Sequence, residues 1–144
     1  MNEYKTVIIA VDLSEESNQV VKRGLQVCGD AKPHITHVVE PISFAYGGDI
    51  PMDFSGIQEE IHKQAKSQLA KLASTYQIPE ERQHLLLGRP ENEVHSLAKE
   101  LDADLVVVGS HGRHGLALIL GNTANGIIHG ATCDVLAVRV GDDR

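Results

Sequence analysis

Two short runs of apolar residues constrain the fold of this chain more than any other feature. Residues 7–11 (Val-Ile-Ile-Ala-Val) and 105–108 (Leu-Val-Val-Val) are continuously apolar and rich in β-branched side chains. A strand with one face in water alternates apolar with polar residues, so continuous runs are typical of strands buried on both faces. Such strands occur in parallel sheets that helices cover on both sides. The sequence therefore predicts an α/β protein.

Helical patterns separate these runs from three further expected strands. Apolar residues recur at helical spacing over 15–28, 54–76, 90–101 and a segment around Ile127. The other strands are expected at 35–39, 85–88 and 135–138. Ser14 is expected to cap the first helix and Pro90 to begin the third. Regular alternation of strand and helix predicts one doubly wound domain over residues 1–144, with right-handed crossovers.

Composition excludes several classes of protein. A chain of 144 residues buries roughly 68–70% of its unfolded surface, which is enough for a core without disulfides. Its net charge is −7 and only 3% of residues are aromatic, so nucleic acid is not an expected partner. No apolar run approaches the ~18 residues of a membrane span, and the N-terminus does not resemble a signal peptide, so we expect a cytoplasmic protein. Cys28 and Cys133 are expected to be reduced thiols.

A glycine-rich segment follows the second apolar run and is the strongest sign of a ligand site. Gly109 and Gly112 come directly after the expected strand, Arg113 follows, and Gly121-Asn122-Thr123 precedes the last helix. Glycines let the backbone approach a ligand closely, and a helix N-terminus favours an anion. The sequence therefore predicts that this segment binds phosphate. It lacks the Gly-Lys-Ser/Thr of a Walker A loop and the Gly-x-Gly-x-x-Gly of dinucleotide-binding proteins.

Four segments, in this order, resemble the universal stress protein family over essentially the whole chain. They are 8–14 (Ile-Ile-Ala-Val-Asp-Leu-Ser), 36–39 (Thr-His-Val-Val), 106–112 (Val-Val-Val-Gly-Ser-His-Gly) and 133–138 (Cys-Asp-Val-Leu-Ala-Val). The resemblance implies a five-stranded parallel sheet in the order 3-2-1-4-5. It also implies a homodimer paired through the last strand, and, for one branch of the family, ATP or AMP bound at the carboxyl edge of the sheet.

The nucleotide-binding branch carries Gly-x-x-Gly, a nine-residue spacer, and then Gly followed by Ser or Thr. Gly109 and Gly112 match this pattern, but the spacer here has eight residues and Asn122 follows Gly121. The Asn122 amide can contact a phosphate and can also cap a helix, and Thr123 offers a hydroxyl in its place.

Individual roles also follow from the resemblance. Asp12 would lie near the ribose hydroxyls, although as a residue it could equally cap the following helix. Val38 would meet the adenine edge through its backbone. The expected nucleotide-binding residues are Ala10, Val11, Asp12, Val38, Val108, Gly109, His111, Gly112, Arg113, Gly121, Asn122 and Thr123.

No arrangement of catalytic residues accompanies the predicted phosphate-binding segment. Ser110 and His111 are adjacent in sequence, which does not give the geometry of a nucleophile and its base. Mg²⁺ could accompany ATP, with Asp12 and Asp53 as candidate ligands, and slow ATP hydrolysis stays an alternative. His111 and His114 are three residues apart, but with no third ligand we expect them to face phosphate or solvent rather than a metal.

We therefore expect a nucleotide-responsive sensor or adaptor that acts as a homodimer. Nucleotide is expected to order the loops at 41–51 and 109–121. An alternative is a dimeric scaffold that binds no nucleotide. Either would pair through the apolar edge strand, which holds Val135, Leu136, Ala137 and Val138.

Overall fold

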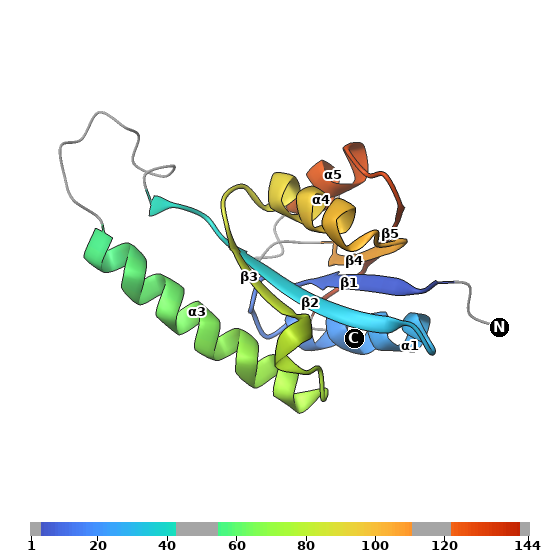
Figure 1. Ribbon diagram of the computed structural model, residues 1–144, viewed down its shortest axis with the longest axis horizontal. Coiled ribbons are helices and arrows are strands. Elements are labelled where there is room, and N and C mark those ends of the chain that lie inside the picture. The colour runs from blue at the N-terminus through green and yellow to red at the C-terminus, as the bar shows by residue number, and fades with distance from the viewer. Residues whose placement is uncertain (1–3, 43–54, 111–121, 142–144) are drawn as a thin grey trace.

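The computed structural model describes residues 4–42, 55–110 and 122–141 (Figure 1). Its elements are β1 (Thr6–Ala10), α1 (Ser17–Cys28), β2 (Lys32–Val39), α3 (Ser55–Thr75), the 3₁₀ turn Glu80–Arg82, β3 (Gln83–Leu87), α4 (Pro90–Leu101), β4 (Leu105–Gly109), α5 (Asn122–His129) and β5 (Asp134–Val138). The five strands form one sheet in the order β3-β2-β1-β4-β5, and every neighbouring pair is parallel. The expected α/β class, strand order and alternation are confirmed.

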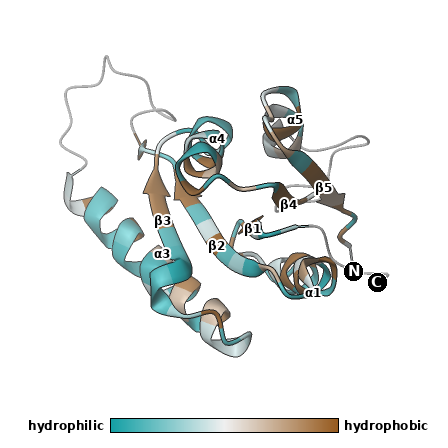
Figure 2. Ribbon diagram, turned by 45° about the vertical axis from the view of Figure 1, so that its right-hand side comes forward, coloured by the Kyte–Doolittle hydropathy of each residue, from teal (hydrophilic) through white to brown (hydrophobic). Residues whose placement is uncertain are grey.

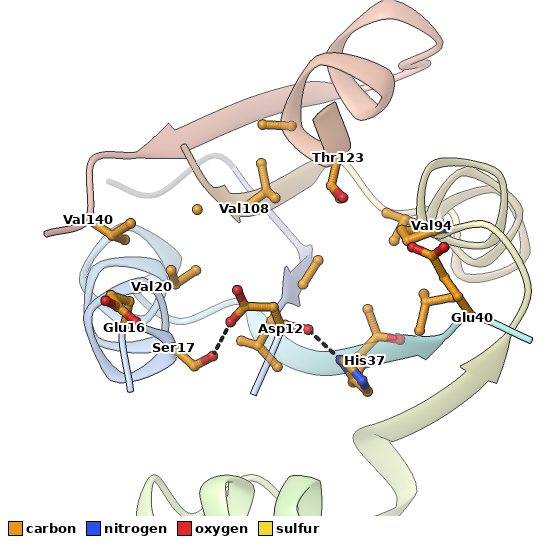
Figure 3. Close-up of a pocket in the computed structure, with 17 residues that line it drawn as sticks. Asp12, Glu16, Ser17, Val20, His37, Glu40, Val94, Val108, Thr123 and Val140 are labelled. Atoms are coloured by element: carbon orange, nitrogen blue, oxygen red, sulfur yellow. Dashed lines mark hydrogen bonds between the residues drawn. The ribbon is translucent and has the colours of Figure 1, made fainter. Parts of the chain in front are cut away.

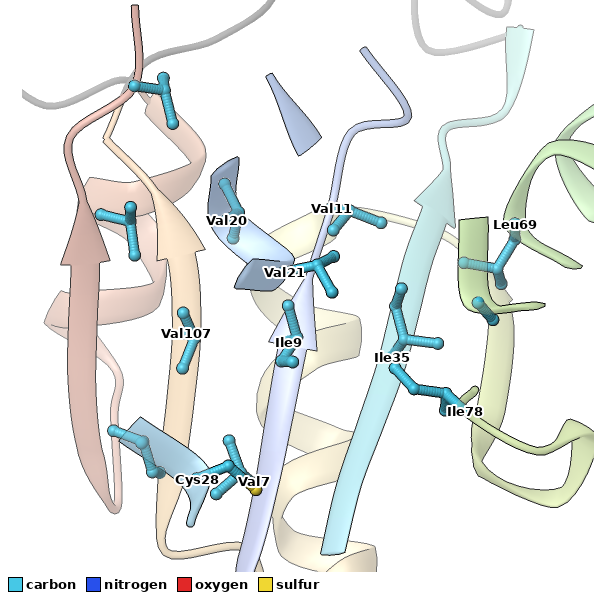
Figure 4. Close-up of a cluster of buried hydrophobic side chains, with 14 residues drawn as sticks. Val7, Ile9, Val11, Val20, Val21, Cys28, Ile35, Leu69, Ile78 and Val107 are labelled. Atoms are coloured by element: carbon cyan, nitrogen blue, oxygen red, sulfur yellow. The ribbon is translucent and has the colours of Figure 1, made fainter. Parts of the chain in front are cut away.

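Helices cover both faces of this sheet. Helices α1 and α3 lie on one face and α4 and α5 on the other (Figure 1). Figure 2 shows hydrophobic residues on β4 and β5 and hydrophilic residues over most of α3. Two apolar clusters result, one on each side of the sheet. The cluster beneath α1 and α3 includes Val7, Ile9, Ile35 and Val107, several of which are labelled in Figure 4.

The second cluster explains why the apolar runs are continuous. Ile8 belongs to it, together with Val106 and Val108, whereas Val7 and Ile9 face the opposite side. Successive side chains of a strand point to opposite faces, so a strand covered on both sides needs apolar residues at every position. All of Val7, Ile8 and Ile9 are fully buried.

Strand β2 begins earlier than the sequence indicated, at Lys32 rather than residue 35. Proline is rare in central strands because it lacks an N–H, and Pro33 hid this extension. Pro33 pairs with Val7 of β1, but β3 joins β2 only from Ile35 onward. The backbone nitrogen of Pro33 falls on the side where β3 has not yet begun, so no sheet hydrogen bond is lost.

The first helix begins at Ser17, so the prediction that Ser14 caps it was wrong. Glu16 is at the N-cap position, and no side chain caps the helix. Ser14 donates instead from both its N–H and its hydroxyl to Oδ1 of Asp12, at 3.0 and 2.6 Å. The expected start of α4 at Pro90 is confirmed.

Helix α3 extends past the sheet that it covers. It has 21 residues, about 31 Å, against five residues in β3, roughly 17 Å. Ala65, Leu69 and Ala73 are buried against the sheet, but Ile57 and Ile61 at the start of the same stripe are 56% and 39% exposed. The helical spacing of these two residues therefore predicted the helix correctly but not its contacts.

Two further expectations concern cysteines and membranes. Cys28 and Cys133 are free thiols, as expected. Burial is the largest cause that raises the pKa of both thiols. Among the helices that the structure describes, none is long and apolar enough to cross a bilayer.

Candidate functional site

A pocket of about 410 Å³ opens at the carboxyl edge of the sheet (Figure 3). Strand β1 lies in the middle of the sheet, with β2 on one side and β4 on the other. The chain leaves β1 for β2 in one direction and enters β4 on the opposite side, so the strand order reverses here. Open α/β sheets bind ligands at such a reversal. The lining residues are Ala10, Val11, Asp12, Glu16, Ser17, Val20, Thr36, His37, Val38, Glu40, Pro90, Val94, Val108, Gly109, Thr123, Ala124 and Val140.

Seven of the twelve residues predicted to bind nucleotide line this pocket. They come from three strands, the two residues after β1 and one helix: Ala10, Val11, Asp12, Val38, Val108, Gly109 and Thr123. Asn122, expected just before α5, is its first residue, so Thr123 lies in the first turn of that helix. The remaining predicted residues, His111, Gly112, Arg113 and Gly121, lie outside the described residues, as do Asp53, His114 and most of both loops expected to respond to nucleotide.

Asp12 sits at the centre of the pocket and also holds the turn that leads into α1. Its Oδ1 atom accepts hydrogen bonds from the N–H and hydroxyl of Ser14 and from the Ser17 hydroxyl, the last at 3.1 Å (Figure 3). Ser17 is 2% exposed and Asp12 is half-buried, so this bond is partly shielded from water. Asp12 therefore has a structural role beside any role toward a ligand.

Strand β2 offers the backbone of Val38 to the pocket. Strand residues two apart direct their backbone hydrogen bonds to the same neighbouring strand. Thr36 faces β1, because its carbonyl oxygen accepts from the N–H of Val11 at 2.9 Å. Val38 faces the same side, but β1 has ended at Ala10. The N–H and C=O of Val38 thus point into the space beyond the end of β1.

His37 is a pocket residue that the sequence analysis did not assign. Its Nδ1 atom lies 2.8 Å from the carbonyl oxygen of Val11 (Figure 3). Because a carbonyl only accepts, Nδ1 carries the proton and donates. This contact ties the end of β1 to β2. A histidine directly before Val38 in a strand beside β1 was the available signal.

Other unassigned lining residues come from helix starts. Glu16, Ser17 and Val20 belong to the start of α1, and Pro90 and Val94 to the start of α4. With Thr123 of α5, three helix N-termini reach the pocket. Helices that follow parallel strands all begin at the carboxyl edge, so their first turns could have been predicted as pocket walls.

The charges around the pocket are unevenly distributed. Asp12, Glu16 and Glu40 place three carboxylates on its wall, and none of its lining residues in the described ranges is Lys or Arg. Within 4–42, 55–110 and 122–141, no group of three or more potential metal ligands occurs. A pocket of this kind offers hydrogen-bond acceptors along β1 and β2, and helix N–H groups at α5.

Comparison with known proteins gives one consistent result. The model of the universal stress protein family matches residues 3–139. Universal stress protein A homolog 1 of Coxiella burnetii is 43% identical over 139 residues, which are 94% of this chain and 96% of that protein. The structure of UspA from Lactobacillus plantarum superposes with a TM-score of 0.71 at 18% identity, covering 96% and 98% of the two chains. A universal stress protein in complex with cAMP superposes with a TM-score of 0.61 at 26% identity, covering 94% and 96%. This chain belongs to the universal stress protein family.

Proposed function

We propose that this protein is a cytoplasmic stress-response sensor or adaptor that binds ATP or AMP and acts as a homodimer. One observation carries the proposal: the pocket at the reversal point combines an apolar slot, acceptor groups and a helix N-terminus. These three features match the three parts of an adenine nucleotide, namely a flat base, a ribose with two hydroxyl donors, and an anionic phosphate chain.

The apolar slot suits a purine ring. Val38, Val94, Val108 and Ala124 belong to the buried cluster on the α4 side of the sheet, and all four line the pocket. A planar ring inserted among them would leave water while its edge meets the Val38 backbone. The N–H and C=O of Val38 complement N1, an acceptor, and the 6-amino group, a donor, of adenine.

The opposite end of the pocket suits phosphate. Thr123 lies in the first turn of α5, and Figure 3 shows its side chain directed into the pocket. The N–H groups of that turn have no partner inside the helix, and the helix dipole favours an anion there. The proposal assigns the phosphates to this turn, with His111, Gly112, Arg113 and Gly121 of the preceding segment as further contacts. Mg²⁺ would accompany the phosphates of ATP.

The relatives support the same assignment at a coarser level. The chain belongs to the universal stress protein family, and one structural neighbour was crystallised in complex with the cyclic adenine nucleotide cAMP. The proposed dimer would join the two β5 strands, since β5 forms one edge of the sheet. Its outward backbone groups are then paired by a second copy rather than left as an open edge.

A substitution at Thr123 tests the proposal. Thr123→Asp places a carboxylate in the first turn of α5, where it favours the helix but repels phosphate. We expect ATP to raise the thermal midpoint of the wild-type protein and to leave that of the variant unchanged. Ser55→Asp is the matched control, because it adds the same charge to the first turn of α3, which does not line the pocket.

Two results would contradict the proposal. An equal ATP-dependent shift in wild type and Thr123→Asp would place the phosphates elsewhere. No shift in either protein at millimolar ATP would favour the dimeric scaffold. Release of inorganic phosphate by the wild-type protein in the presence of Mg²⁺ would instead favour the weak ATPase.

A further inference from the structure

Glu40 lines the pocket but was not among the residues expected to bind nucleotide. It follows β2 directly and lines the pocket two residues beyond Val38. Glu40 and Val94 of α4 both line the pocket, and Figure 3 draws them on the same side of it, whereas Glu16 lies on the α1 side. Val94 is one of the apolar residues of the slot proposed for the base. Glu40 is thus placed at the rim of this slot.

The chemistry of a carboxylate at that rim is selective. An ionised carboxylate only accepts hydrogen bonds, so it attracts an amino group and repels a carbonyl oxygen. Adenine carries an amino group at position 6 and hypoxanthine a carbonyl oxygen, while the ribose and phosphates of their nucleotides are the same. A ring whose edge faces the Val38 backbone directs position 6 along β2, toward the residues that follow Val38.

We propose that Glu40 is a specificity-determining residue that selects 6-aminopurine over 6-oxopurine nucleotides. This inference rests on the proposed function, because it assumes that a purine nucleotide occupies the pocket. Val38 and Glu40 have separate roles in recognition of the base. The backbone of Val38 holds the base edge, and the side chain of Glu40 adds an acceptor that a carbonyl oxygen at position 6 cannot satisfy.

Glu40 is well suited to substitution. Its side chain is exposed and is absent from both buried clusters, so its replacement removes no core contact. Glu40→Gln keeps the size of the side chain but adds an amide that can donate to a carbonyl oxygen. Glu16→Gln is the matched control, because it removes the same charge from the same pocket on the α1 side.

The test is a calorimetric titration of the wild-type protein and these two variants with ATP and with ITP. We expect the wild type to bind ATP at least about tenfold more tightly than ITP, the scale of one charge-assisted hydrogen bond. In Glu40→Gln this ratio should fall by about tenfold, and Glu40→Ala should show the same fall. Glu16→Gln should keep the wild-type ratio.

Three other outcomes of the titrations would overturn the inference. A wild-type ratio that persists in Glu40→Gln and Glu40→Ala would overturn the inference and assign selection to Val38 alone. Equal binding of ATP and ITP by the wild type would also overturn it, while nucleotide binding itself would stand. A wild-type protein that binds neither nucleotide would refute the proposed function and this inference with it.

Discussion

The hydroxyl of Ser17 donates a hydrogen bond of 3.1 Å to Oδ1 of Asp12, within the turn between β1 and α1. The same oxygen atom accepts two hydrogen bonds from Ser14. One carboxylate oxygen therefore fixes the turn that shapes the pocket. Under the proposed function Asp12 would also meet the ribose, so substitutions there should affect both stability and ligand binding.

Asp12→Asn keeps an acceptor at the position of Oδ1, whereas Asp12→Ala removes it. We expect Asp12→Ala to lower the free energy of unfolding by about 1–2 kcal/mol, because the buried Ser17 hydroxyl and the half-buried donors of Ser14 lose their acceptor. Asp12→Asn should cost distinctly less, yet both should weaken ATP binding. Urea denaturation and calorimetry check the two effects. If the two variants are equally destabilised, the turn does not depend on this acceptor.

Close contact between α1 and the sheet gives a second prediction. A Cβ atom at Gly24 would lie 2.8 Å from Cδ1 of Ile9, which is fully buried, and 2.9 Å from its Cγ1. Gly24→Ala should therefore destabilise the protein by about 1–2 kcal/mol, despite the better helix propensity of alanine.

Gly56→Ala is the control for this substitution. Gly56 lies in α3, and a Cβ atom there would have no neighbour within 4 Å. Its substitution should be neutral or stabilising by a few tenths of a kcal/mol. Denaturant unfolding of both variants measures the difference. A Gly24→Ala variant as stable as the Gly56→Ala variant would mean that α1 can move away from Ile9 at no cost.

Two stacked histidines predict a dependence of stability on pH. Nδ1 of His34 and Nε2 of His84 are 2.9 Å apart, so one nitrogen donates and the other must stay unprotonated. Burial is the largest cause that lowers the pKa of both rings. Nearby His84, Arg82 and Lys32 further lower the pKa of His34, whereas Glu100 acts to raise that of His84.

The direction of this pH dependence follows from the number of protons that the folded and unfolded states bind. Since the pKa of each ring is lower in the folded state, the unfolded chain binds more protons below the ordinary histidine pKa of about 6.5. The stability due to the pair is therefore complete above pH 6.5 and is lost as the pH falls below it. His84→Gln should reduce this loss, and His62→Gln, at an exposed position on α3, should not. Urea denaturation between pH 5 and 8 measures the free energy of unfolding of the three proteins. If it depends on pH identically in His84→Gln and wild type, the histidine pair does not cause the loss of stability.

The open edge of β5 gives a prediction about assembly. The Val138 carbonyl accepts from the N–H of Ser110 at 2.8 Å, so Val138 faces β4 and Ala137 faces outward. Ala137→Pro removes one outward N–H without loss of a bond to β4. We expect it to weaken the proposed dimer to a monomer while the fold persists.

Leu87→Pro is the control at the opposite edge. Gly88 donates to Val39 of β2, so Leu87 faces outward from β3. The dimer should survive this substitution, as judged by light scattering coupled to size-exclusion chromatography. A dimer that is lost in Leu87→Pro but not in Ala137→Pro would mean that the other edge forms the interface.

Most of the topology could be predicted from the sequence, because strands buried on both faces leave a direct signal. Val7, Ile8 and Ile9 have no exposed surface, as a strand covered on both faces requires at successive positions. The start of β2 could not be predicted in this way. Pro33 is tolerated there only because β3 begins to pair later, at Ile35, which is a tertiary fact.

The site was predictable in part, for a similar reason. Ala10 ends β1, Asp12 follows two residues later and Val108 is the last residue but one of β4, and strand ends meet at one edge of a parallel sheet. Glu40 and His37 also line the pocket. The place of His37 directly before Val38 was a signal, whereas nothing local distinguishes Glu40 from other residues near a strand end. The role of Ser14 was misjudged because its hydroxyl donates to Asp12, two residues earlier, and the helix begins only at Ser17.

Calorimetry tests whether the pocket binds an adenine nucleotide. Purified wild-type protein, freed of any co-purified nucleotide, is titrated with ATP and then with AMP in the presence of Mg²⁺. We predict a Kd for ATP in the micromolar range, about −8 kcal/mol, and weaker binding of AMP because fewer phosphates reach α5. No heat of binding with either nucleotide at millimolar concentration would contradict the account.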